Sequence, residues 1–111
     1  MAEIIRQAGA VWHGDLRNGN GTISTESTVL AETPYNFRKR FEDEPGTNPE
    51  ELIAAAHAAC YNMAFANTLA KKGYDPKTLD TYAAITFERQ NGGFAIVKSS
   101  LRVRGQVPGL D

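Results

Sequence analysis

The fold is decided by the stretch NPEELIAAAHAACYNMAFANTLAKKG, which occupies residues 48–73. Asn48 is a good N-cap, Pro49 suits the first helical position, and Glu51 completes an Asn-x-x-Glu capping box. No glycine or proline interrupts the chain until Gly73, which stands where a C-cap glycine belongs. These signals predict a helix of about 24 residues, which is about 36 Å long.

The middle of this helix, residues 52–60, is small or apolar on every side apart from His57. A helix that is apolar all round is expected to be buried all round. Such a helix is hard to cover with one chain of 111 residues, and this is the first indication of an oligomer.

The chain before the helix predicts antiparallel strands. Residues 8–16 place apolar side chains mostly at even positions, which is the period of a half-buried strand. The Asn-Gly pairs of residues 18–21 favour a hairpin turn, so residues 22–30 are expected to return as a second strand. A short third strand is expected at residues 36–42.

The chain after the helix predicts an antiparallel hairpin. Apolar and polar side chains alternate in residues 81–89, and the Asn-Gly-Gly of residues 91–93 is a turn signal. The strand that follows has one apolar face, made of Ala95, Val97, Leu101, Val103 and Val107. The expected fold class is therefore α+β, with N-terminal antiparallel strands, a long central buried helix and a C-terminal antiparallel hairpin.

Length and composition restrict the class of protein. A chain of 111 residues holds one domain, so residues 1–111 are expected to form it. Hydrophobic residues at 41% and charged residues at 23% argue against disorder and coiled coil. Twelve basic and thirteen acidic residues give a net charge of -1, which argues against a nucleic-acid partner or an anionic membrane. No apolar run predicts a membrane span, and a single cysteine favours the cytoplasm.

Cys60 is the only thiol, and two interpretations of it stay open. In the first, it is an inert small hydrophobe in a buried helix. In the second, it is a nucleophile, which requires that the reactive thiolate form be stabilised. Cys60 lies about three turns into the helix, beyond the reach of the helix macrodipole, so a cation from elsewhere has to supply that stabilisation.

Charged residues near the start of the helix are candidates for this role. A basic run, Arg38, Lys39 and Arg40, precedes three acids. Its first two residues are interpreted as part of a solvated, locally neutral loop, whereas Phe41 beside Arg40 favours an inward-facing guanidinium. Glu50 equally fits a first-turn acid that stabilises the helix dipole.

The histidines give a weaker signal. His57 lies three residues before Cys60 and fits either a hydrogen-bonded core residue or a base. His13, His57 and Cys60 lack the ligand spacing of a metal site, so no metal is expected.

Five segments carry a resemblance to a known family: Trp12-His13-Gly14-Asp15, Gly21-Thr22-Ile23-Ser24-Thr25, Pro34-Tyr35-Asn36-Phe37, Gly46-Thr47-Asn48-Pro49-Glu50-Glu51-Leu52 and Ala55-Ala56-His57-Ala58-Ala59-Cys60. They resemble the osmotically inducible protein C branch of the OsmC/Ohr family over nearly the whole chain. The resemblance implies an intertwined α+β homodimer with sites at the subunit interface. It implies a thiol-dependent peroxidase of oxidative and osmotic stress defence, which reduces organic hydroperoxides and, less well, hydrogen peroxide. It implies no metal or bound organic cofactor, and an external dithiol reductant such as a lipoyl group.

The resemblance also assigns roles to residues. It maps the peroxidatic thiol to Cys60, the activating arginine to Arg40, and the acid that orients this arginine to Glu50. Four apolar residues of the helix are expected to line the substrate pocket, although they fit a core equally well: Leu52, Ile53, Tyr61 and Met63.

Helix geometry adds an expectation about the two subunits. Glu50 and Cys60 are about 15 Å apart along one straight helix, so they cannot meet within it. If two copies of the helix cross antiparallel near Ala55, residues 50 and 60 come level in two equivalent sites. We therefore expect Cys60 of one subunit to face Glu50 and Arg40 of the other.

A single cysteine departs from the family pattern. Family members carry a second, resolving cysteine in a C-terminal segment, so residues 1–111 are expected to lack the helix and strand that carry it. The alternative function is a non-catalytic dimeric module that binds an apolar ligand at the subunit interface, with Cys60 packed and protonated.

Overall fold

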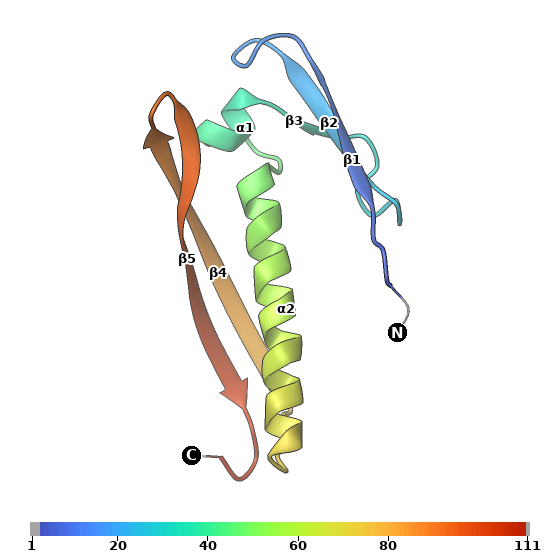
Figure 1. Cartoon of the computed structure of the whole chain (residues 1–111), viewed down its shortest axis with the longest axis vertical. Helices are drawn as coiled ribbons and strands as arrows, with labels where there is room; N and C mark the ends of the chain where they lie inside the picture. Colours follow the sequence, from blue (N-terminus) through green and yellow to red (C-terminus); the bar gives the residue numbers. More distant parts are fainter. Residues whose placement is uncertain (1–2, 111) are drawn as a thin grey trace. The chain divides into compact units, whose positions relative to one another are not determined.

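A computed structural model describes residues 3–110 of the chain (Figure 1). The chain divides into two compact units, Met1–Pro49 and Glu50–Asp111. Within the described residues, no helix is long and apolar enough to cross a membrane.

The N-terminal unit is a three-stranded antiparallel sheet followed by a single helical turn. Its strands are β1 (Ala8–His13), β2 (Asn20–Thr25) and β3 (Thr33–Tyr35), in the order β1-β2-β3, and the helical turn is α1 (Phe37–Phe41).

One row of the register joins all three strands of this sheet. Gly21 in β2 pairs with Trp12 on one side and with Tyr35 on the other. The two aromatic rings meet over this glycine, with their centroids 5.3 Å apart at an interplanar angle of 56°. Because Gly21 is buried and has no side chain, the rings close against the backbone itself.

Two predictions about this unit are wrong. Residues 37–41 form a helical turn rather than a strand, because the Asn36 side chain caps it by accepting a hydrogen bond from Lys39 N at 2.9 Å. The second strand ends at Thr25 and does not reach residue 30, because Thr28 takes a positive φ of 65° and Thr25 N donates to Leu30 O at 2.8 Å in a turn. Local side-chain capping and turn bonds thus override the weak strand pattern of these Thr- and Ser-rich residues.

The C-terminal unit contains the long helix α2 (Pro49–Lys71) and a hairpin of β4 (Thr78–Gln90) and β5 (Gly93–Gln106). The helix begins at the predicted proline. It ends in a Schellman motif, in which Tyr74 N donates to Leu69 O and Gly73 N donates to Ala70 O, with Gly73 at a φ of 89°. Figure 1 shows α2 running alongside the hairpin.

The β4–β5 hairpin turns at the Asn-Gly-Gly sequence that predicts it. Asn91 and Gly92 both have positive φ, 48° and 80°, as a two-residue type I′ turn requires. Along β4, half-buried side chains alternate with exposed ones, in agreement with the predicted period of two. The register shifts after Thr86, which leaves Val97 as the extra residue of a bulge in β5. Val97 is therefore exposed, and its predicted place on the apolar face of the strand is wrong.

The hairpin covers one side of α2 only. Thr81 Oγ1 donates to Asn62 Oδ1 at 2.5 Å, and the His57 ring lies 2.6 Å from Ser99 Oγ, so both strands are tied to the helix. Only Glu50 and Leu69 of α2 are buried, and Met63 is 77% exposed. The helix is therefore not buried on every side within one chain.

The ring contact over Gly21 gives a test of the N-terminal unit. A methyl group at this position would lie 2.7 Å from Trp12 Cε3 and 2.8 Å from Tyr35 Cε1, closer than non-bonded carbons approach. We expect Gly21→Ala to lower the free energy of unfolding by about 2 kcal/mol through overpacking. The measurement is urea unfolding followed by Trp12 fluorescence.

Gly9→Ala is the matched control for this substitution. Gly9 lies in the neighbouring strand β1, and an added methyl group there meets nothing within 4 Å. We expect this variant to change stability by less than about 0.5 kcal/mol. Equal unfolding midpoints for the two variants would show that the rings do not close on the Gly21 backbone.

Candidate functional site

Cys60 lies on the side of α2 that is exposed in this chain. Ile53, Ala56 and Met63 are exposed at helical spacing from it, so these four residues share one face of the helix. We call them the thiol face. Cys60 is exposed, and the other three members of this face are apolar.

His57 belongs to the hairpin side of the same helix. Its Nδ1 lies 2.6 Å from Ser99 Oγ in β5. This contact supports the interpretation of His57 as a hydrogen-bonded structural residue, and it leaves the alternative of a base without an observation in its favour.

Glu50 is buried, with 7% of its surface exposed, in the first turn of α2. A solvated first-turn acid would stabilise the helix dipole from the surface, whereas a buried carboxylate needs hydrogen-bonded or charged partners. Its burial favours a specific role for Glu50 over a general dipole effect.

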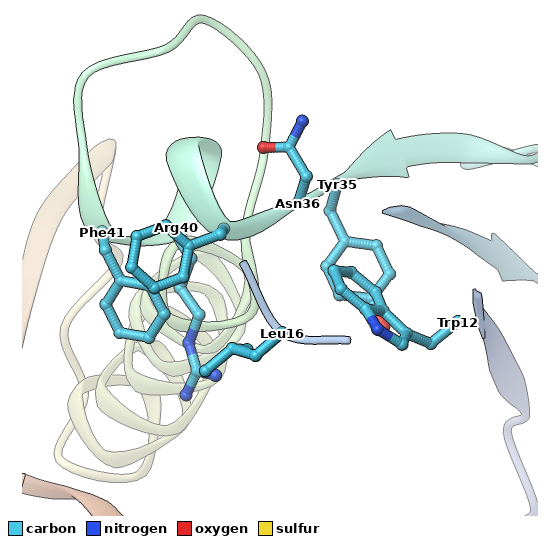
Figure 2. Close-up of a pocket in the computed structure, with 7 residues that line it drawn as sticks. Trp12, Leu16, Tyr35, Asn36, Arg40 and Phe41 are labelled. Carbon is cyan, nitrogen blue, oxygen red and sulfur yellow. The ribbon is translucent and has the colours of Figure 1, made fainter. Parts of the chain in front are cut away.

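Arg40 lines a pocket of about 290 Å³ that lies wholly within the N-terminal unit. The other residues that line it are Trp12, Leu16, Tyr35, Asn36, Phe37 and Phe41. Figure 2 shows the Arg40 guanidinium beside Leu16, and its carbon lies 4.9 Å from the centroid of the Phe41 ring. The guanidinium thus stands over an aromatic face in a concave, largely apolar setting, which is the inward-facing orientation predicted from Phe41.

Aromatic rings build the walls of this pocket. Besides the pair formed by Trp12 and Tyr35, the rings of Phe37 and Phe41 pack with their centroids 4.7 Å apart. Sequence reasoning placed the substrate lining on the helix and did not find this pocket. The strand register that aligns Trp12 with Tyr35 is the signal that would have indicated it.

Lys39 is not the solvated loop residue that the sequence suggested. Its side chain is only 15% exposed, and its ammonium lies 2.5 Å from Glu44 Oε2. Asn36 Nδ2 donates to the same carboxylate oxygen at 3.1 Å. The Lys39 ammonium, followed by the Asn36 amide, holds the pKa of the Glu44 carboxyl below its ordinary value.

The four apolar residues expected to line the substrate pocket all lie on α2. Ile53 and Met63 belong to the thiol face, and the Tyr61 ring packs against Phe65 with the centroids 5.9 Å apart. Met63 also lines a shallow hollow beside residues 76–79 at the start of β4. Leu52 is half-buried near the start of α2.

The proposed catalytic residues are divided between the two units. Arg40 belongs to the N-terminal unit, whereas Glu50 and Cys60 belong to the C-terminal unit. Among residues 3–110, no cluster of three or more His, Cys, Asp and Glu side chains is placed to hold a metal ion.

Solved structures share this fold. An organic hydroperoxide resistance protein from Elizabethkingia anophelis superposes with a TM-score of 0.64 at 23% identity, over 99% of this chain and 76% of its own. OhrB, the organic hydroperoxide resistance protein of Bacillus subtilis, does so with a TM-score of 0.63 at 22% identity, over 95% of this chain and 74% of its own. The class is thus the α+β architecture of organic hydroperoxide resistance proteins.

Sequence comparison identifies the family. The family described as OsmC-like protein matches residues 41–111. The peroxiredoxin OsmC of Escherichia coli strain K12 is 49% identical over 108 residues, which are 97% of this chain and 76% of the relative. The peroxiredoxin OsmC of Shigella flexneri matches to the same extent, with 49% identity over 97% of this chain and 76% of that relative. The chain belongs to the OsmC-like protein family.

The Glu44 contacts give a prediction for acid stability. Because the folded pKa of this carboxyl is lowered, its contribution to stability is complete above the ordinary value of 4.5 and is lost as the pH falls through the lower folded value. We expect Glu44→Gln to be less stable than the parent protein at pH 7, and the difference to shrink below pH 4.5. Thermal unfolding at a series of pH values measures it.

Asp43→Asn serves as the control, because Asp43 is an exposed acid adjacent to Glu44 in the chain. We expect its stability difference from the parent to stay near zero across the same pH range. A Glu44→Gln difference that does not depend on pH would contradict the charge interaction with Lys39.

Proposed function

We propose that this protein is a thiol-dependent peroxidase that reduces organic hydroperoxides to alcohols, and hydrogen peroxide less well, through Cys60. The observation that carries the proposal is the position of the only thiol in the sequence, exposed on an apolar face at mid-length of α2. Membership of a family whose relatives are named peroxiredoxin OsmC supports it.

The chemistry requires two steps. The Cys60 thiolate attacks the distal oxygen of the hydroperoxide, the O–O bond breaks, and the leaving alkoxide takes a proton to become an alcohol. Cys60 is then a sulfenic acid. A dithiol reductant attacks the sulfenic sulfur and releases water, and its second thiol resolves the mixed disulfide and restores the Cys60 thiol. We propose an external dithiol such as a lipoyl group for this step, and the cytoplasm as the reducing compartment.

Arg40 is proposed as the cation that stabilises the thiolate and the charge that develops on the breaking O–O bond. A guanidinium in a partly desolvated pocket is suited to this because charge-assisted hydrogen bonds are stronger away from water. Glu50 is proposed to hold the guanidinium, and its burial supports a paired carboxylate.

A homodimer is proposed to complete the site. The thiol face is an exposed apolar surface on a helix that its own hairpin covers on the opposite side only. Since Glu50 and Cys60 are about 15 Å apart along one helix, an antiparallel crossing with a second copy would bring them level. In this arrangement, Cys60 of one subunit faces Glu50 and Arg40 of the other.

The aromatic pocket is proposed to bind the organic part of the substrate. Its volume of about 290 Å³ suits a compact organic group, and its rings offer flat faces that pack well against aryl substituents. The residues predicted on the helix, Leu52, Ile53, Tyr61 and Met63, are proposed to contribute the remaining apolar surface around the sulfur.

The substitution Cys60→Ser tests the proposed peroxidase activity. We expect the turnover of cumene hydroperoxide with dithiothreitol to fall by roughly 10³-fold or more, to the background rate, because serine is not a nucleophile toward the O–O bond. Thr68→Ser, at an exposed position of the same helix, is the control and should keep parental activity. Turnover retained in Cys60→Ser would show that Cys60 is not the nucleophile, and parental turnover no faster than the background rate would favour the non-catalytic module that binds an apolar ligand.

Trp12→Leu tests the substrate pocket. We expect the KM for cumene hydroperoxide to rise about ten-fold, because a wall of the pocket is lost, while the rate with hydrogen peroxide stays within about two-fold. Tyr82→Leu is the control, since Tyr82 is an aromatic residue of β4 that is 70% exposed. Equal loss with both peroxides would show that Trp12 acts on the fold and not on substrate choice.

A further inference from the structure

The loop that follows α1 is bound back onto it by four polar side chains, Asn36, Lys39, Glu44 and Asn48, which we call the α1 strap. Glu44 Oε2 accepts from the Lys39 ammonium at 2.5 Å and from Asn36 Nδ2 at 3.1 Å. Asn48 Nδ2 donates to the Lys39 carbonyl oxygen at 2.9 Å. Lys39 is therefore held at both its side chain and its backbone.

The strap is partly withdrawn from water. The side chains of Lys39 and Glu44 are 15% and 31% exposed. Gly46 packs on the Lys39 stem with a φ of 139°, and a methyl group at this position would lie 2.4 Å from Lys39 Cε. The loop can close over Lys39 because residue 46 has no side chain. An ion pair with this degree of burial and a second hydrogen bond is more strongly ordered than an exposed surface pair.

The helical turn α1, which the strap contacts, is too short to be stable on its own. The helical turn α1 has five residues, and an isolated helix of this length does not form in water. It depends on the Asn36 cap at Lys39 N and on the contacts of the loop. Whatever fixes the rotation of this turn also fixes the direction of each side chain on it.

Lys39 and Arg40 are consecutive residues of this turn, so their side chains leave it about 100° apart. The Lys39 side chain points to Glu44 in the loop, whereas the Arg40 guanidinium stands in the aromatic pocket beside Leu16 (Figure 2). Anchoring the first side chain therefore sets the direction of the second. Neither charge of the strap has to touch substrate to affect the guanidinium.

We propose that Lys39 and Glu44 are positioning residues for Arg40, which act by locking the rotation of α1 so that the guanidinium stays in the aromatic pocket. This inference rests on the proposed function, in which Arg40 stabilises the Cys60 thiolate and the breaking O–O bond. The strap keeps the arginine ordered before substrate arrives, which removes the cost of ordering a long side chain in the reaction step.

A double-mutant cycle between Glu44 and Arg40 tests the proposal. Glu44→Gln keeps the shape of the side chain and removes its charge. We expect it to lower kcat/KM for cumene hydroperoxide about ten-fold in the parent protein and by less than about two-fold in an Arg40→Gln background, because the strap then has no guanidinium to position. A purely structural role would give the same factor in both backgrounds, and that result would overturn the proposal.

A second pair of variants guards against simple loss of folding. Lys39→Met keeps the apolar stem and removes the ammonium, and we expect it to match Glu44→Gln in kcat/KM. The charge swap Lys39→Glu with Glu44→Lys should recover at least about half of the lost activity on a logarithmic scale. No recovery in a swap variant that is folded by circular dichroism would overturn the proposal. Asp43→Asn is the control and should keep parental activity.

The same experiment separates this proposal from the proposed function. If Arg40→Gln alone retains parental activity, the role given to Arg40 is wrong and the positioning role falls with it. If Arg40→Gln is impaired and Glu44→Gln is not, the proposed function stands and only the positioning role is overturned.

Discussion

A single two-stranded hairpin can cover only one side of a long helix, and this constraint governs the C-terminal unit. The ties from His57 and Asn62 to the strands fix which side of α2 is covered. The uncovered side carries Ile53, Met63 and the only thiol of the sequence, Cys60. Exposing an apolar helix face to water is unfavourable, and an exposed apolar patch is typical of a surface that binds a partner. Because the hairpin packs on the opposite side of α2, Cys60 and the apolar side chains around it are left exposed.

The core of the N-terminal unit is built mainly from aromatic rings. Its sheet has only three short strands, so its core is supplied by rings and not by layers of aliphatic side chains. Gly21 lets the Trp12 and Tyr35 rings meet over the backbone, and the Phe37 and Phe41 rings of α1 pack on each other. These four rings line a concave space, and Arg40 lines it with them.

The elements that the sequence predicted well are those whose signals are local. The α2 boundaries follow from Pro49 and Gly73, and the β4–β5 turn follows from the φ preferences of Asn91 and Gly92. The α1 turn was missed because its strand-like pattern is short, and Asn36 decides between the two structures only through its capping bond. The bulge at Val97 depends on pairing between strands, which no pattern within one strand records.

The site residues show the same limit. The catalytic roles of Cys60, Arg40 and Glu50 come from a motif and stay predictions, to which the structure adds that Glu50 is buried and that Arg40 lines the aromatic pocket. The sequence predicts that Lys39 lies in a solvated, locally neutral loop, because oppositely charged residues close in sequence usually form exposed pairs. The structure instead pairs Lys39 with Glu44, with both side chains partly buried. Burial of this pair depends on the loop folding back over Lys39 at Gly46, and composition carries no information about that.

The proposed activation of the Cys60 thiol requires a group outside α2. The macrodipole of α2 acts mainly on its first turn, where Glu50 and Glu51 already stand, and Cys60 lies about three turns farther along. The cation proposed to stabilise the thiolate, Arg40, is carried by the other unit, on a helical turn that is stable only through its cap and strap. Under this proposal, the reactivity of the Cys60 sulfur is expected to follow the order of that helical turn.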